Sequence, residues 1–200
     1  MGTEFPGVVF LTEGVDAFAD HGRISIDFEA QYRLDLGCMS ETDPAEWIEI
    51  GTRPFVKDYD AVEAERPANL PFHLKGARMA LLSSHIGGER TGGAIVAVDC
   101  PDLKILGGRS DVAALVDLRV ATSFRRRGLG AALFERACAW SRAQACSEIR
   151  VETQDTNPAA CRFYRSLGCT LYSLESGAYG AGCDETKVVW TYSLTRSLLH

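Results

Sequence analysis

Alternating apolar and polar positions mark the strands that the sequence predicts. Residues 23–36 alternate with a period of two, which is typical of a half-buried strand. Apolar runs at 79–84 and 94–98 flank the stretch HIGGERTGG, whose four glycines supply the backbone freedom of a turn, so a hairpin is expected there. Further strands are predicted at 112–120, 148–152, 169–174 and 187–194.

Two stretches have the spacing of helices. The first, 128–145, carries apolar residues at intervals of four, four and three, which places them on one face. The second is expected after Asn157, a strong N-cap, with Pro158 at the first helical position and Gly168 as the stop.

The segment 38–74 follows neither pattern. It is rich in Asp, Glu and Pro, and its stretches DPAEWIEI and FVKDYDAVEAE predict short helices and loops that lie over a sheet edge. Residues 1–7 are expected to lie outside the fold. The order of the elements predicts an α/β (α+β) fold, in which helices pack on a mixed sheet.

The composition favours a single globular domain, residues 1–200. Of these 200 residues, 46% are hydrophobic and 24% are charged, which is ordinary for a globular protein with one core. A net charge of −6 argues against generic binding to nucleic-acid phosphates, so cationic small molecules are the expected partners.

The cysteines and the apolar runs predict where the protein resides. Seven cysteines without a C-x-x-C pair indicate neither a disulfide framework nor a zinc site, so we expect no metal and a reducing, cytoplasmic setting. No apolar run approaches ~18 residues, and Met1 to Phe10 lack the pattern of a signal peptide. Neither a membrane span nor export is expected.

The junction 117–130, with the sequence DLRVATSFRRRGLG, is the main candidate for chemistry. A strand ends, three arginines and two glycines follow in an arginine–glycine loop (residues 125–130), and a helix begins. Glycines permit close approach to an anion, and the helix start offers unpaired N–H groups, so the junction predicts a pyrophosphate cradle. A solvated arginine turn is the alternative. A Walker loop is excluded, and a dinucleotide fingerprint is disfavoured because Leu133 stands at the third glycine position.

Two motifs together resemble a known family. L-R-V-x-x-x-x-R-x-x-G-x-G at 118–130 and N-x-x-A-x-x-F-Y-x-x-x-G at 157–168 are similar to the GNAT superfamily of acetyl-CoA-dependent N-acetyltransferases. The stretches FVKDYDAVEAERP, ERTGGAIVAVD, GRSDVAALVDLRV, VETQD and VVWTYSL further resemble streptothricin acetyltransferases over roughly 23–194. Those enzymes acetylate an amine of the β-lysine part of these antibiotics. The stretch SGAYGAGCDETK, residues 176–187, departs from the tyrosine- and proline-rich segment of the drug-modifying members.

The resemblance implies a fold and a cofactor site. The fold would be a mixed, mostly antiparallel sheet flanked by helices, with strands splayed at an acetyl-CoA site in the core 112–168 and a variable segment at 1–22. Main-chain groups of 118–120 would pair with the pantetheine arm, and the amides of 126–131 would hold the pyrophosphate. The implied acetyl-CoA contacts are Leu118, Arg119, Val120, Arg125, Arg126, Arg127, Gly128, Leu129, Gly130, Ala131, Asn157, Ala160 and Phe163. Core packing for the apolar residues and solvation for the arginines are the alternatives.

Three residues are the catalytic candidates. Tyr164 could donate a proton to the departing thiolate, or be an amphipathic tyrosine on a half-buried helix. An alkylammonium has a pKa of ~10.4 and must lose a proton before it attacks, so a base is needed. Asp117 and Glu152 are the candidates, with Glu152 preferred; each could instead bind a cationic substrate or pair with arginine. No histidine stands in a context that would activate Cys161, so direct transfer is expected.

The resemblance therefore implies transfer of an acetyl group to a primary amine of a small cationic acceptor, with streptothricin as one possibility. The acidic stretch 58–65 could attract a polycation, although charged helices are usually solvated. A non-catalytic acyl-CoA-binding module, or transfer to a polyamine or peptide amine, are the alternatives. No nucleic acid or membrane partner is expected, and the protein is expected to be a monomer or a homodimer.

Overall fold

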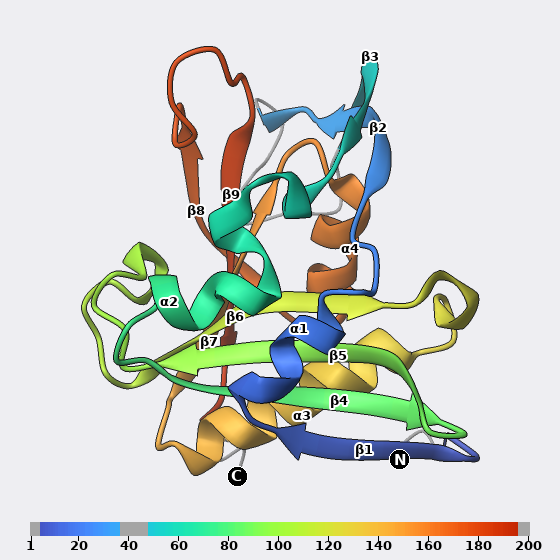
Figure 1. Ribbon diagram of the computed structural model, residues 1–200. Helices are drawn as coiled ribbons and strands as arrows, with labels where there is room; N and C mark the ends of the chain where they lie inside the picture. The colour runs from blue at the N-terminus through green and yellow to red at the C-terminus, as the bar shows by residue number, and fades with distance from the viewer. Residues whose placement is uncertain (1–4, 37–47, 196–200) are drawn as a thin grey trace, which may run out of the picture. The chain divides into compact units, whose positions relative to one another are not determined.

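The computed structural model describes residues 5–36 and 48–195, and it has a mixed α/β fold in which helices flank mostly antiparallel strands (Figure 1). The chain forms two compact units. Unit one comprises residues 1–26, 59–149 and 193–200, and unit two comprises 27–58 and 150–192.

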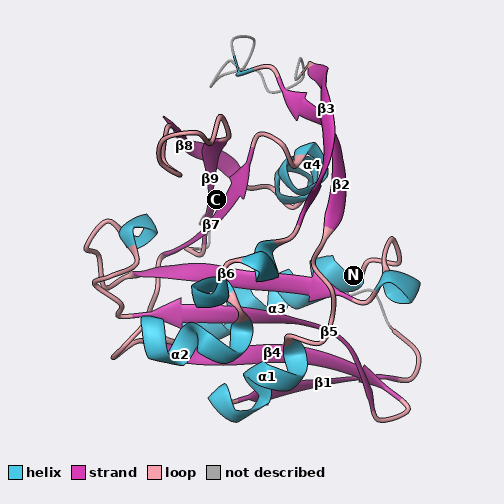
Figure 2. Cartoon of the chain, turned by 45° about the horizontal axis from the view of Figure 1, so that its top comes forward, coloured by secondary structure: helices cyan, strands magenta, loops and turns pink. Residues whose placement is uncertain are grey.

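Four antiparallel strands form the sheet of unit one (Figure 2). In their order across the sheet they are β1 (Val8–Glu13), β4 (Arg78–Ile86), β5 (Glu89–Val98) and β6 (Val112–Val120). The predicted strand at 112–120 is confirmed. The predicted hairpin is also confirmed, but its turn is shorter than expected. Only Gly87 and Gly88, with φ of +59° and +88°, form the turn, as a two-residue β-hairpin requires.

Helices cover both faces of this sheet. α1 (Phe18–His21) and α2 (Leu70–His73) lie on one face and α3 (Leu129–Ala143) on the other (Figure 1). Two adjacent glycines of β5 show the division, because a Cβ at Gly92 would lie 3.1 Å from Leu133 of α3, whereas one at Gly93 would lie 2.9 Å from His21 of α1. The predicted apolar face of α3 is confirmed. Its buried residues are Leu129, Leu133, Phe134, Ala137, Cys138 and Ser141.

One hydrophobic cluster of unit one lies between this sheet and α1 and α2. Phe18, Leu81 and Ile95 are fully buried, and Leu70 and Leu106 pack in the same cluster. Connections between the strands include short 3₁₀ turns, which are η1 (Val15–Ala17), η6 (Pro67–Asn69), η7 (Lys104–Leu106) and η8 (Thr122–Phe124).

Unit two contains two groups of strands and one helix. β2 (Phe28–Leu34) pairs with β3 (Glu49–Lys57), while β7 (Glu148–Gln154), β9 (Thr186–Ser193) and β8 (Thr170–Ser176) are neighbours in that order. The first two residues of β7 and the last residue of β9 belong to unit one.

The helix of unit two, α4 (Pro158–Ser166), begins and ends as the sequence predicts. The Asn157 side chain accepts a hydrogen bond from the amide of Ala160 at 3.0 Å, which satisfies one of the donors that a helix start leaves open. At the other end, Gly168 has a φ of +89°, a conformation that glycine adopts without strain.

The structure corrects three other expectations in part or in full. No strand was predicted before residue 23, yet β1 forms there, and the strand expected at 23–36 begins only at Phe28. In the segment 38–74, the structure has β3 and two 3₁₀ turns, η4 (Tyr59–Ala61) and η5 (Glu63–Glu65), where helices were mainly predicted. Residues 37–47, which include most of DPAEWIEI, lie outside the described part. β3 forms because β2 offers a partner strand, and such pairing overrides local helix preference.

The six described cysteines, Cys100, Cys138, Cys146, Cys161, Cys169 and Cys183, form no disulfide, and Cys38 lies outside the described residues. Burial raises the pKa of Cys138 to about 12 and that of Cys161 to about 11, so both thiols are poor nucleophiles at neutral pH. Within the ranges 5–36 and 48–195, no helix has the length and apolar character needed to cross a membrane.

The close contact of Gly93 with α1 generates a stability prediction. In Gly93→Ala the new Cβ would lie 2.7 Å from Leu81 and 2.9 Å from the His21 ring, and both side chains are fully buried. We expect a loss of about 1–3 kcal/mol in the free energy of unfolding, measured by denaturant titration. The matched control is Gly14→Ala, where a Cβ meets nothing within 4 Å. Equal stability of the two variants would contradict the prediction.

Candidate active site

The arginine–glycine loop has the backbone geometry of an anion site. β6 ends at Val120, the turn η8 follows, and α3 begins at Leu129. Arg126 and Gly128 both have positive φ, of +61° and +84°, so the chain turns sharply immediately before the helix. No side chain caps the start of α3, and the first amides of a helix have no partner within the helix. These amides can therefore bind an anion, favoured by the helix dipole.

The three arginines of this loop differ in what they contact. Arg125 donates to the carbonyl of Val120 at 2.9 Å and to that of Ser25 at 3.2 Å, so its guanidinium is held against unit one. Arg127 lies with its guanidinium 5.9 Å from the centre of the Phe124 ring, and Arg126 is exposed. Arg126 and Arg127 are both exposed, and unlike Arg125 neither donates to a carbonyl of the described residues.

Asp117 lies in a buried ionic cluster instead of facing a cleft. His21 Nε2 is 2.7 Å from Asp117 Oδ1, and the Arg119 guanidinium donates to Asp117 Oδ2 at 2.6 Å and to both carboxylate oxygens of Asp60 at 2.9 and 3.0 Å. Burial by itself would raise the pKa of Asp117, but His21 and Arg119 hold it below its ordinary value. A carboxylate so committed is a weak base.

Arg119 is the centre of that cluster. Its side chain is almost fully buried, and it also donates to the carbonyl of Ile24 at 2.8 Å. Burial would lower its pKa, but the hydrogen bonds to Asp60 and Asp117 raise it above the ordinary value. The Arg119 guanidinium therefore serves internal packing. The expected main-chain role of Leu118, Arg119 and Val120 stays a prediction.

Glu152, in contrast, lies on β7 with its side chain at the surface but partly desolvated by the surrounding protein. The Tyr179 hydroxyl donates to Glu152 Oε1 at 2.9 Å, and Gln154 Nε2 donates to the Tyr179 oxygen at 2.7 Å. Desolvation by the surrounding protein raises the pKa of Glu152 above its ordinary value, and Glu175 adds to the rise. Tyr179 and Lys187 act in the opposite direction. A raised pKa brings a carboxylate closer to the range useful for a general base.

Tyr164 lies on α4 and is buried, with 6% of its surface exposed. Its ring meets that of Phe163 edge to face, with the ring centres 5.1 Å apart. One turn earlier, the buried Cys161 thiol lies 3.4 Å from the Thr153 hydroxyl. The described contacts of α4 are therefore those of a packed helix whose first turn is capped by Asn157.

The candidate site residues are distributed over both units. The junction, with Asp117 and residues 118–131, belongs to unit one, whereas Glu152 and the α4 residues belong to unit two. Sequence reasoning missed His21 and Tyr179, which bind the two carboxylates. For Tyr179 the one sequence signal was the unusual composition of residues 176–187, noted above. Nothing in the sequence links His21 to Asp117.

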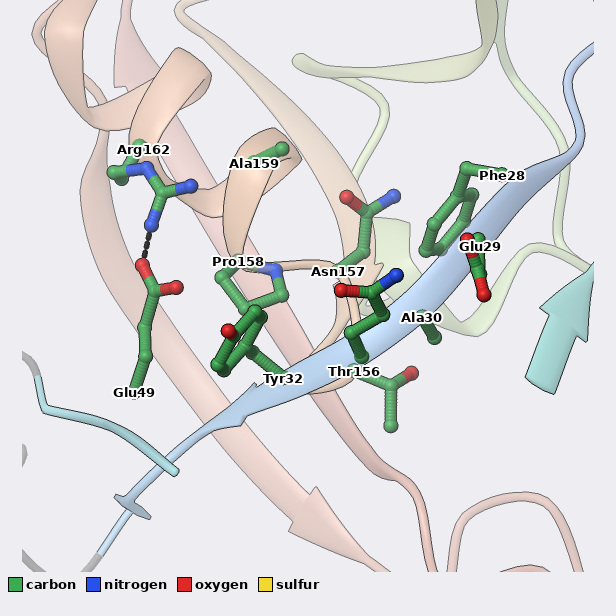
Figure 3. A pocket seen from close by; sticks show the side chains of 11 residues that line it. Phe28, Glu29, Ala30, Tyr32, Glu49, Thr156, Asn157, Pro158, Ala159 and Arg162 are labelled. Atoms are coloured by element: carbon green, nitrogen blue, oxygen red, sulfur yellow. Dashed lines mark ion pairs between the residues drawn. The ribbon is translucent and has the colours of Figure 1, made fainter. Parts of the chain in front are cut away.

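A shallow pocket of about 160 Å³ lies within unit two (Figure 3). It is lined by β2 and by the start of α4, with the Tyr32 ring beside Pro158 (Figure 3). Arg162 pairs with Glu49 at its edge. Asn157 is the one predicted contact residue in its lining, and its carbonyl oxygen is already engaged as the N-cap. Across the described parts of the chain, no group of three or more His, Cys, Asp or Glu is placed to hold a metal.

Comparisons with curated proteins identify two relatives. Streptothricin acetyltransferase A of Bacillus subtilis (strain 168) is 28% identical over 92 residues, which are 45% of this chain and 53% of the relative. Streptothricin acetyltransferase of Escherichia coli is 30% identical over 84 residues, 40% of this chain and 48% of the relative. The chain thus spans about half the length of the curated relatives it matches.

Solved structures show the same fold. A protein of Bacillus anthracis strain Ames, assigned as a streptothricin acetyltransferase and solved with acetyl coenzyme A, has a TM-score of 0.72 at 18% identity, covering 93% of this chain and 99% of that one. Nourseothricin acetyltransferase has a TM-score of 0.67 at 17% identity, covering 94% and 99%.

The family model described as acetyltransferase (GNAT) family matches residues 45–169, a stretch that contains the arginine–glycine loop, Glu152 and α4. This match covers well over half of the chain, and the protein therefore belongs to the acetyltransferase (GNAT) family.

Proposed function

We propose that the protein is an acetyl-CoA-dependent N-acetyltransferase that acts on a primary amine of a small cationic acceptor, with streptothricin as the first candidate. The observation that carries this proposal is the backbone of the arginine–glycine loop, with positive φ at Arg126 and Gly128 directly before α3, inside the family match. The names of the two curated relatives support the choice of acceptor.

The residues of the loop fit the diphosphate of acetyl-CoA. A Cβ on Gly128 would touch only the Phe5 ring, at 3.5 Å, so glycine is needed there for its φ of +84° and not for internal packing. The open amides at the start of α3 would bind phosphate oxygens, and the exposed Arg126 and Arg127 would add charge. Leu129 packs its side chain in the core, which fixes the first turn of the helix.

When bound, acetyl-CoA supplies an acyl group already activated as a thioester. Glu152 accepts a proton from the acceptor ammonium, which frees the nitrogen lone pair to form the new C–N bond. As the C–S bond would break, Tyr164 would donate its phenolic proton to the departing sulfur, and the second proton that the nitrogen must lose on becoming an amide would restore the phenol. We assign the base to Glu152 in preference to Asp117 because Asp117 is committed to His21 and Arg119.

The charge of the chain suits a cationic acceptor. The net charge is −6, and Asp58, Glu63 and Glu65 of the acidic stretch are exposed, whereas Asp60 is taken by Arg119. We place this activity in one domain, residues 1–200. We also place the protein in the reducing cytoplasm, because its described cysteines form no disulfide. No role for nucleic acid is proposed, and a monomer or homodimer stays the expectation.

An acceptor screen tests the proposed function. Purified protein with acetyl-CoA should release free thiol when streptothricin is added, with kcat/KM at least about tenfold above that for spermidine or a lysine peptide. Brisk turnover of a polyamine with none of streptothricin would remove the antibiotic as acceptor. Binding of acetyl-CoA without thiol release for any amine would instead favour a non-catalytic module.

A second prediction concerns the loop. Gly128→Val should weaken acetyl-CoA binding by at least about 2 kcal/mol, or about 30-fold in Kd, because valine resists the left-handed conformation and crowds the backbone amides. Isothermal calorimetry measures the affinity. The matched control is Gly108→Val, since Gly108 has a φ of +72° and open space around it but lies outside the loop. Equal affinities of the two variants would remove the loop from the cofactor site.

A third prediction concerns Tyr164. Tyr164→Phe should lower kcat ~100-fold or more while the Kd for acetyl-CoA stays nearly constant, because a general acid acts mainly in the transition state. Tyr172→Phe, which removes the same hydroxyl from an exposed tyrosine of β8, should leave kcat unchanged. Wild-type kcat in Tyr164→Phe would reassign the tyrosine to packing.

A further inference from the structure

The loop between β8 and β9 carries a tyrosine to Glu152. Three glycines, Gly177, Gly180 and Gly182, have φ of +73°, +88° and +93°, conformations that would strain other residues. Tyr179 lies among them. Its hydroxyl reaches Glu152 on β7 at 2.9 Å, so this glycine-rich loop touches the proposed base.

The direction of the hydrogen bonds around Tyr179 follows from their donors. Gln154 Nε2 donates to the Tyr179 oxygen at 2.7 Å, and Gln154 is itself buried, with 6% of its surface exposed. A phenol has a single proton, and with Gln154 as donor that proton is directed to Glu152 Oε1. The three side chains form an aligned chain that stabilises the ionised carboxylate.

A second set of contacts fixes the tyrosine ring and its loop. The Lys57 ammonium lies 5.9 Å from the centre of the Tyr179 ring and pairs with Glu185 at 2.5 Å. Glu185, at the other end of the loop, also accepts a hydrogen bond from the Thr156 hydroxyl at 2.5 Å. Strand β3 and the turn before α4 thus hold the loop at a point close to Tyr179.

We propose that Tyr179 is a positioning residue that orients the Glu152 carboxylate and keeps it ready to accept a proton from the acceptor amine. The proposal rests on the proposed function of Glu152 as the base. Tyr179 acts through Glu152, and Gln154 and Lys57 act through Tyr179. The segment 176–187 thereby contributes to the chemistry of the site.

The charged groups around Glu152 define the expected effect. Besides Tyr179, they are Lys187 on β9, which stabilises the ionised form of Glu152, and Glu175 on β8, which destabilises it. Lys187 and Glu175 also pair with each other at 2.5 Å. Loss of the Tyr179 hydroxyl removes one group that lowers the pKa of Glu152, while desolvation continues to raise it. The pKa must then rise, so more of Glu152 is protonated and inactive at a given acidic pH.

The experiment compares wild type with Tyr179→Phe. The acidic limb of the kcat/KM profile for streptothricin should move to higher pH by about half to one pH unit, the effect expected of a single hydrogen bond to a carboxylate. A ¹³C NMR titration of the Glu152 carboxyl should move in the same direction by the same amount. Thermal melts by circular dichroism check that the variant is folded.

Two further variants sharpen the test. Gln154→Glu replaces the donor by a carboxylate that accepts the Tyr179 proton and adds negative charge, so it should shift both titrations in the same direction. Tyr172→Phe is the matched control and should shift neither. An unmoved Glu152 titration in folded Tyr179→Phe, or an equal movement in Tyr172→Phe, overturns the proposal.

Glu152→Gln separates this proposal from the proposed function. Full turnover in Glu152→Gln would overturn the assignment of the base and, with it, the positioning role proposed for Tyr179. The NMR titration in Tyr179→Phe reports on the Tyr179–Glu152 bond itself and does not depend on activity. A loss of turnover in Glu152→Gln together with an unmoved NMR titration would leave Glu152 as the base and remove Tyr179 as its positioning residue.

Discussion

The pairing of the buried Asp117 carboxylate with His21 and Arg119 is the interaction on which unit one most depends. A charge removed from water is costly unless it is paired and hydrogen-bonded, and here His21 and Arg119 supply both. The pairing joins α1 to β6, and the His21 ring lies so close to β5 that only glycine fits at position 93. Removing one partner of such a pair typically costs about 3–5 kcal/mol, because the other charge is left buried.

The same cluster, together with Arg125, anchors the chain at both ends of its first excursion into unit two, residues 27–58. Arg119 contacts the carbonyl of Ile24 and the carboxylate of Asp60, and Arg125 contacts the carbonyl of Ser25. Ile26 is the last residue of unit one before the excursion, and Tyr59 is the first after it. The residues that flank this first excursion are therefore tied to β6 and to the arginine–glycine loop that follows it.

Two carboxylates that look alike in the sequence acquire different roles from their surroundings. Asp117 faces His21 and Arg119, which hold its pKa low, and Glu152 faces a neutral hydroxyl where the surrounding protein partly desolvates it, which leaves its pKa raised. Environments that separate the pKa values of similar groups often distinguish structural from catalytic acids. In unit two, the pair Arg33–Asp155 connects β2 to the turn that leads into α4, and the pair Lys57–Glu185 connects β3 to the loop between β8 and β9.

The sequence by itself determined the elements whose causes are local. β6, the apolar face of α3 and the Asn157 cap depend on residues a few positions apart, and each was predicted. Tertiary structure decided the rest. β3 exists because β2 pairs with it, and His21 meets Asp117 across 96 positions of the chain. Tyr179 reaches Glu152 across 27 positions. Periodicity and capping act over a few residues, whereas the ionisation and contacts of a side chain depend on whichever distant segment the fold brings beside it.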